Sequence, residues 1–157
     1  MHTHFSLRYG ILSPEEYLQT MQELGYCDVR LTDINNTSAT LDFVRMAPNY
    51  GIKPVVGVDF RNGAQRRYVA LAKNNAGFKA INDHLSSYSH AKEPFDVRAP
   101  YMPYTYVIYP FKVAADLKLT ALRKHEFIGV TAADLPQLRL ASPQLATSDK
   151  LVAIPTI

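Results

Sequence analysis

Gly51-Ile52-Lys53-Pro54-Val55-Val56-Gly57-Val58-Asp59-Phe60 is the stretch that decides the fold. Its nearly continuous apolar run over 52–60 is typical of a strand buried on both faces. Asn62-Gly63 follows directly and is a strong signal for a hairpin turn into a second strand over 68–72. The stretch therefore predicts a central strand paired with its successor.

Helices and strands alternate around this centre. Ser13 is a helix-capping residue, Pro14 suits a first helical position, and Gly25 suits the residue after a helix end. A helix capped by Thr37 or Ser38 is expected next, ending at Pro48. The other predicted helices span 75–88, 113–125 and 132–140, a loop spans 90–103, and further strands span 27–31, 104–109, 127–130 and 151–154. This alternation predicts an α/β domain with mostly parallel strands.

The composition is that of an ordinary globular domain. The chain has 157 residues, of which 47% are hydrophobic and 20% are charged, and its formal net charge is +3. No apolar run approaches the roughly 18 residues that indicate a membrane span, so no membrane partner is expected. The single cysteine, Cys27, cannot form an internal disulfide, which favours a cytoplasmic location and a small buried thiol.

Three further blocks carry a family resemblance together with the central stretch. They are His2-Thr3-His4-Phe5-Ser6-Leu7-Arg8-Tyr9-Gly10, Leu31-Thr32-Asp33-Ile34-Asn35-Asn36-Thr37-Ser38 and Leu71-Ala72-Lys73-Asn74-Asn75-Ala76-Gly77-Phe78. In order and spacing they resemble the N-terminal PHP (polymerase and histidinol phosphatase) domain of bacterial DNA polymerase III alpha subunits. The resemblance implies one PHP domain over 1–157 within a much longer polymerase chain. It also implies a barrel-like fold, a distorted or truncated β/α barrel with mostly parallel strands.

The resemblance raises the question of whether the chain catalyses metal-assisted phosphoester cleavage. Metal-binding PHP domains collect imidazoles and carboxylates at several strand ends, where they hold divalent ions that activate water. The positions that keep such side chains here are His2, His4, Asp33 and Asp59. Either His2 and His4 form the family's pair, or His2 is its second member and His4 lies beside the site.

Other ligand positions carry side chains that do not bind metals. Tyr9 stands where metal-binding members have a carboxylate or a histidine, and Ile34 replaces a ligand histidine. Arg67 aligns with another ligand histidine, and a permanent cation repels a metal ion. Asp59 is one methylene shorter than the usual glutamate, and the family's late Asp-x-His pair is absent from the sequence. The resemblance therefore implies too few ligands for a multinuclear centre, and at most a weakly bound Zn, Mn or Mg ion.

Simpler roles are available for each of these residues. His2 and His4 could be solvated at the terminus, Asp33 could order a turn, and Asp59 could pair with Arg61 or Lys53. Aromatic residues, which could stack on single strands, are better explained by packing. Two groups complete the list: the expected surface histidines His84, His90 and His125, and the basic cluster Arg61, Arg66, Arg67 and Lys73, which either contacts a DNA backbone or is a solvated face.

Three hypotheses follow. The favoured one is a degenerate, metal-poor structural and interaction module that contacts the remaining domains of a polymerase alpha subunit and docks a proofreading exonuclease subunit, with DNA reached through the parent chain. The second is a metal-dependent 3′–5′ exonuclease or phosphoesterase. The third is a module that binds the DNA backbone. DNA polymerisation itself, a nucleotidyl transfer, is implied only for the parent chain.

Overall fold

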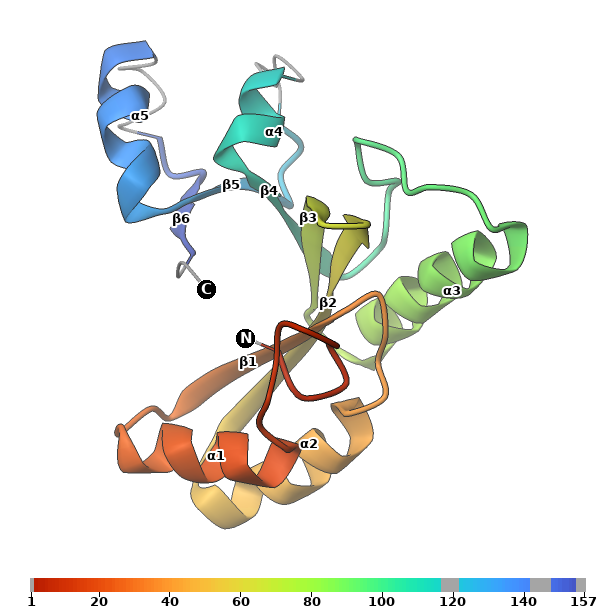
Figure 1. Ribbon diagram of the computed structural model, residues 1–157, viewed down its shortest axis with the longest axis vertical. Coiled ribbons are helices and arrows are strands. Elements are labelled where there is room, and N and C mark those ends of the chain that lie inside the picture. Colours follow the sequence, from red (N-terminus) through yellow and green to blue (C-terminus); the bar gives the residue numbers. More distant parts are fainter. Residues whose placement is uncertain (1, 117–121, 142–147, 155–157) are drawn as a thin grey trace.

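A computed structural model describes residues 2–116, 122–141 and 148–154 of the chain. Within these residues six strands form one sheet in the order β1-β2-β3-β4-β5-β6, and the sheet curls into half a barrel (Figure 1). Pairs β1–β2, β4–β5 and β5–β6 are parallel, whereas β3 is antiparallel to both of its neighbours. The expected barrel-like α/β fold with mostly parallel strands is confirmed. The strands are β1 (Asp28–Ile34), β2 (Lys53–Asn62), β3 (Gln65–Ala72), β4 (Thr105–Pro110), β5 (Glu126–Val130) and β6 (Leu151–Ala153).

Helices cover the convex side of the sheet (Figure 1). They are α1 (Pro14–Glu23), α2 (Thr40–Met46), α3 (Asn75–Ala91), α4 (Phe111–Asp116) and α5 (Leu135–Ala141), with short 3-10 turns η1 (Ala47–Tyr50) and η2 (Ala132–Asp134). Two hydrophobic clusters result. One joins α1 and α2 to β1 around Leu18, Leu31 and Phe43, and the other joins α3 to the centre of the sheet around Phe60 and Tyr68.

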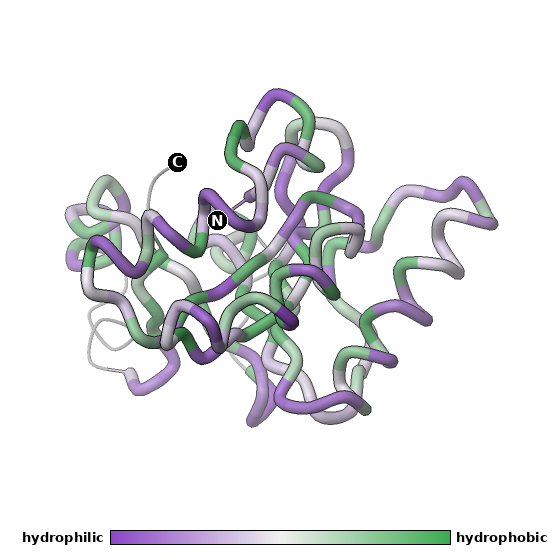
Figure 2. The backbone as a smooth tube through the Cα atoms, turned by 90° about the horizontal axis from the view of Figure 1, so that it is seen from below, coloured by the Kyte–Doolittle hydropathy of each residue, from purple (hydrophilic) through white to green (hydrophobic). Residues whose placement is uncertain are grey.

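Local signals explain the elements that the sequence predicts well. Ser13 and Glu16 form a reciprocal capping box at the start of α1, and Gly25 takes a left-handed φ of 75° after its end. Gly63 has a φ of 59° in the β2–β3 hairpin, a conformation that glycine adopts without steric cost. Asn74 caps α3, whose alternating hydrophilic and hydrophobic residues are visible on the helix that projects at the right of Figure 2.

Two expected helices differ from those observed. Neither Thr37 nor Ser38 caps α2, which begins after Ala39 with no side-chain cap. Thr37 instead donates its hydroxyl hydrogen to Asn82 Oδ1 at 2.9 Å, a bond between segments far apart in sequence. The helix predicted over 113–125 is also wrong in extent: α4 ends at Asp116, residues 117–121 lie outside the described part, and 122–125 are not helical.

Two expectations about burial are corrected as well. Cys27 is exposed and not a small buried side chain. His84, expected at the surface, is only 8% exposed, because it packs into the aromatic cluster of α3 and shares a 2.7 Å hydrogen bond with the Tyr68 hydroxyl. No helix in the described ranges combines the length and apolar character needed to span a bilayer.

Candidate functional site

The two aspartates singled out by sequence lie on neighbouring strands. Asp33 is the penultimate residue of β1, and the parallel register places Ile34 opposite Asp59 on β2. Both carboxylates are buried, with 2% of Asp33 and none of Asp59 exposed. Because an unpaired buried charge is very costly, each carboxylate must be stabilised by nearby hydrogen-bond donors or cations.

Two arginines neutralise Asp59. Arg61 Nη2 and Nε lie 2.7 Å and 3.1 Å from Asp59 Oδ2, in a geometry that directs both N–H groups at one oxygen. From β3, Arg66 adds Nε at 2.9 Å and Nη2 at 2.8 Å to the same oxygen. Arg61 is itself only 7% exposed, so the guanidinium groups enclose the carboxylate. We call Asp59, Arg61 and Arg66 the arginine–aspartate cluster.

His2 completes the enclosure from the N-terminal segment. Its Nδ1 donates to the carbonyl oxygen of Thr32 at 2.6 Å, which fixes the ring on β1. Its Nε2 accepts from Arg61 Nη2 at 3.3 Å and lies 3.5 Å from Asp59 Oδ2. Burial lowers the pKa of His2, although the Asp59 carboxylate opposes this. A neutral imidazole with one donor and one acceptor satisfies both contacts, and the expectation of a solvated His2 is wrong.

Asp33 holds the N-terminal segment in place. The Thr3 backbone N–H and the Ser6 hydroxyl both donate to Oδ1 at 2.7 Å, and the Thr3 hydroxyl donates to Oδ2 at 2.7 Å. Ser6 Oγ in turn accepts from the Ile34 N–H at 2.8 Å. The carboxylate therefore orders residues that lie 27 to 30 positions earlier in the chain.

The structure also describes the family positions Tyr9, His4 and Arg67. Tyr9 places its ring 4.5 Å from the Arg61 guanidinium carbon, a cation–π contact. His4 is exposed, and its ring lies against that of Phe5 at an interplanar angle of 33°, with 4.4 Å between ring centroids. Arg67, identified from sequence as the cation in a ligand position, has a buried Nε without a hydrogen-bond partner in the described structure. Arg66, the preceding residue, is the one that reaches Asp59.

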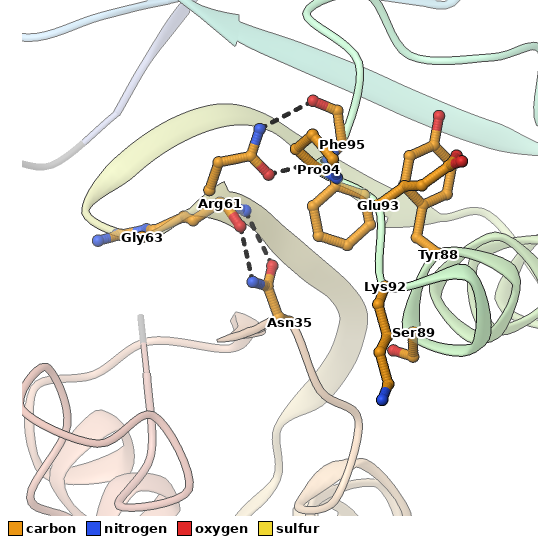
Figure 3. Close-up of a pocket in the computed structure, with 10 residues that line it drawn as sticks. Asn35, Arg61, Gly63, Tyr88, Ser89, Lys92, Glu93, Pro94 and Phe95 are labelled. Atoms are coloured by element: carbon orange, nitrogen blue, oxygen red, sulfur yellow. Dashed lines mark hydrogen bonds between the residues drawn. The ribbon is translucent and has the colours of Figure 1, made fainter.

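Two asparagine side chains form paired hydrogen bonds with the backbone beside the cluster. Asn35 exchanges two hydrogen bonds with the backbone of Arg61, its Nδ2 donating at 2.7 Å and its Oδ1 accepting at 2.8 Å. Asn62 clamps the backbone of Phe95 in the same way at 2.9 Å (Figure 3). A cavity of about 510 Å³ lies between the hairpin and the end of α3. Two asparagine side chains therefore fix the backbone of Arg61 and of Phe95 beside the cluster.

The residues present do not fit a multinuclear metal centre. A divalent ion needs lone pairs on carboxylates or neutral imidazoles, and here the Asp59 oxygens already accept from two permanent cations. Asp33 accepts three hydrogen bonds, and the His2 ring nitrogens face Thr32 and Arg61. Across the part of the chain that the structure describes, no group of three or more His, Cys, Asp or Glu side chains is placed to hold a metal ion.

The basic cluster proposed from sequence divides into separate groups. Arg61 and Arg66 bind Asp59 and are not presented together as a basic face. Lys73 lies after β3 and contacts the Tyr106 ring instead, at 4.0 Å from its centroid.

Sequence reasoning found half of this arrangement. The two-residue spacing of Asp59 and Arg61 along one strand indicates a shared face, and their pairing was one of the simpler alternatives. It missed the bonds from Arg66 to Asp59 and those from Thr3 and Ser6 to Asp33. The register shift between Phe60 and Arg61 has no signal in the sequence, and neither do the long-range bonds of Asp33.

In sequence, the chain is similar to DNA polymerase III alpha subunits. A curated DNA polymerase III subunit alpha of Campylobacter jejuni is 31% identical over 103 residues, covering 59% of this chain and 8% of the relative. Those of Vibrio cholerae and Pseudomonas aeruginosa are each 29% identical, over 52% and 55% of this chain. The chain thus spans about 8% of the length of these relatives. The PHP domain family matches residues 1–137, and the chain belongs to that family.

Proposed function

We propose that this chain is the N-terminal PHP domain of a bacterial DNA polymerase III alpha subunit, and that it serves there as a metal-poor structural and interaction module. The family match and the names of the relatives support the parent protein. DNA synthesis, a nucleotidyl transfer, is then the activity of domains elsewhere in the parent chain.

The arginine–aspartate cluster is the observation that carries the structural role. Asp59 lies where the resemblance implies a metal ligand, and two guanidinium groups supply the positive charge that a metal would otherwise supply. A guanidinium cannot be deprotonated in a protein, so this charge is present at every working pH. Internal cations in this position stabilise the buried carboxylate and repel divalent ions.

The same contacts join segments that are far apart in the sequence. His2 and Thr3 connect the N-terminal segment to β1, and His2 also contacts Arg61 of β2. Within the hairpin, Arg66 of β3 binds Asp59 of β2. A scaffold with these connections keeps its shape without metal, as a module needs if it is to support other polymerase domains. A proofreading exonuclease subunit is the further partner that we propose.

A metal-dependent 3′–5′ exonuclease is the competing function. It would use His2, His4, Asp33 and Asp59 as ligands, and it requires both arginines to leave Asp59. Purified chain is incubated with a primed DNA labelled at the primer 3′ end, with and without manganese or zinc. We expect no release of nucleotides. Metal-dependent release that is lost in Asp33→Ala and retained in the surface variant Asp83→Ala would reject the structural role in favour of the nuclease.

A further inference from the structure

A second cavity, of about 570 Å³, lies away from the arginine–aspartate cluster. It is formed where β3 ends and where β4 and β5 begin, because Ala72 pairs with Thr105 at that end of the sheet. Asp33 and Asp59 lie toward the other end, where β1 and β2 finish. We call this cavity the tyrosine–lysine groove; the lining residues that define it are Lys73, Tyr101, Tyr104, Tyr106, Lys124 and Phe127.

Three exposed tyrosine rings lie together in the groove. Tyr101 is 69% exposed, Tyr104 59% and Tyr106 43%, whereas Tyr68 and Tyr109 of the core are fully buried. Packing explains the core tyrosines but not these three. An exposed aromatic ring offers a flat apolar face with a polar tip, and nucleic-acid bases stack on such faces.

Positive charges lie beside the rings. The Lys73 ammonium is 4.0 Å from the Tyr106 ring centroid, and the Lys150 ammonium is 5.0 Å from that of Phe127. Lys124 also lines the groove, and none of the described lining residues is acidic. Glu126, the carboxylate nearest in sequence, is fully buried and held by Arg98 at 2.9 Å. The groove therefore presents rings and cations together, with no acidic side chain among its described lining residues.

Two further features fit a ligand site. His125 Nε2 lies beneath this surface with no hydrogen-bond partner in the described structure, while its ring contacts Tyr101 edge-on at 5.4 Å. Tyr104 has a left-handed φ of 55°, which is costly for a non-glycine residue and is found disproportionately at binding sites. The Lys73 N–H donates to the Tyr104 carbonyl at 2.9 Å and holds this conformation.

We propose that the tyrosine–lysine groove binds single-stranded DNA, with bases stacked on the exposed tyrosines and phosphates contacting Lys73 and Lys124. Stacking requires unpaired bases, so the groove selects single strands over duplex. An acidic peptide would satisfy the lysines but would leave the three rings without a partner. The choice of DNA over RNA rests on the proposed function, whereas the rings and charges do not depend on it.

The test is fluorescence anisotropy of a labelled 15-mer of thymidylate titrated with the chain at several salt concentrations. We expect Tyr101→Ala and Tyr104→Ala each to weaken binding at least about fivefold, the lower limit for losing one stacked base. Tyr26→Ala is the matched control, because Tyr26 is 57% exposed but outside the groove. Lys124→Gln should lower the slope of log affinity against log salt by about 0.7, and Lys112→Gln should not change it.

Several outcomes overturn the proposal. These are absence of binding at low salt, equal affinity for duplex DNA, competition by polyglutamate as effective as that by unlabelled oligomer, or equal losses in the Tyr26 control. Tighter binding of a uridylate 15-mer than of thymidylate would overturn the assignment to DNA. Circular dichroism checks that each variant is folded, and Tyr104→Phe, which keeps a ring, should retain wild-type affinity. A negative result in the DNA-binding assay would not contradict the proposed metal-poor role, because that role is tested separately by metal content and nuclease activity.

Discussion

Removing the charge of Asp59 is the perturbation that most directly probes the arginine–aspartate cluster. Asp59→Asn keeps the size of the side chain but leaves Arg61, 7% exposed, and Arg66, whose side chain is 24% exposed, without their anion. Breaking a buried ion pair by removing one partner costs about 3–5 kcal/mol. Since Arg66 can rehydrate in part, we expect the lower end, about 3 kcal/mol of unfolding free energy.

Urea denaturation followed by circular dichroism measures this loss. With a slope of about 1–3 kcal/mol per molar urea, the midpoint should fall by about 1–3 M. Asp83→Asn is the matched control: its ion pair with Lys79 is also short, at 2.6 Å, but its side chain is 63% exposed. Exposed pairs contribute about 0–1 kcal/mol, so the control should lose less than 1 kcal/mol.

Arg66→Gln completes a thermodynamic cycle. Alone it should cost less than Asp59→Asn, because Arg61 still binds the carboxylate through two N–H groups. The double variant should show a coupling energy of at least about 0.5 kcal/mol, as expected for directly contacting residues. A loss below 1 kcal/mol for Asp59→Asn, or additive effects in the cycle, would refute the reasoning that this cluster stabilises the fold.

Three further predictions concern other buried groups. Burial raises the pKa of Glu126, but hydrogen bonds from Arg98, a backbone N–H and Tyr109 lower it overall. The contribution of Glu126 to the free energy of unfolding should therefore be present above pH 4.5 and lost as the pH falls through the lowered pKa. Acid titration should show this loss in the wild type and not in Glu126→Gln. Tyr68→Phe removes the hydroxyl bonded to buried His84 and should cost about 1–3 kcal/mol in urea denaturation, and an unchanged midpoint would contradict this. Gly77→Ala should lower the thermal midpoint, because a Cβ there would clash with the Tyr104 carbonyl oxygen; a stabilised variant would show that this clash relaxes without cost.

Local chemistry made part of the fold predictable. The capping box of α1, the apolar run of β2 and the glycine of the hairpin each act within a few residues, and each was found in the predicted place. Thr37 shows the opposite case: it is a good capping residue by type, but a bond to Asn82 of α3 takes its hydroxyl. Long-range partners override local preference there.

From the sequence, the site was predictable only as a list of candidate residues without their bonding partners. Asp33 and Asp59 were identified by their place in the family blocks, and the structure brings them to neighbouring strands. Their partners depend on geometry that the sequence does not encode locally. Arg66 reaches Asp59 across a β-sheet irregularity after Phe60, and the N-terminal segment folds back onto Asp33 over about thirty residues.

Metal content of the purified chain tests the central claim most directly. The chain is equilibrated with zinc or manganese, freed of unbound ions, and assayed by elemental analysis. Arginines that neutralise Asp59 predict well under one ion per chain, and no change in thermal midpoint on adding a chelator. Two or more tightly held ions per chain would mean that Arg61 and Arg66 leave Asp59 and that the site is a working metal centre, which contradicts the account.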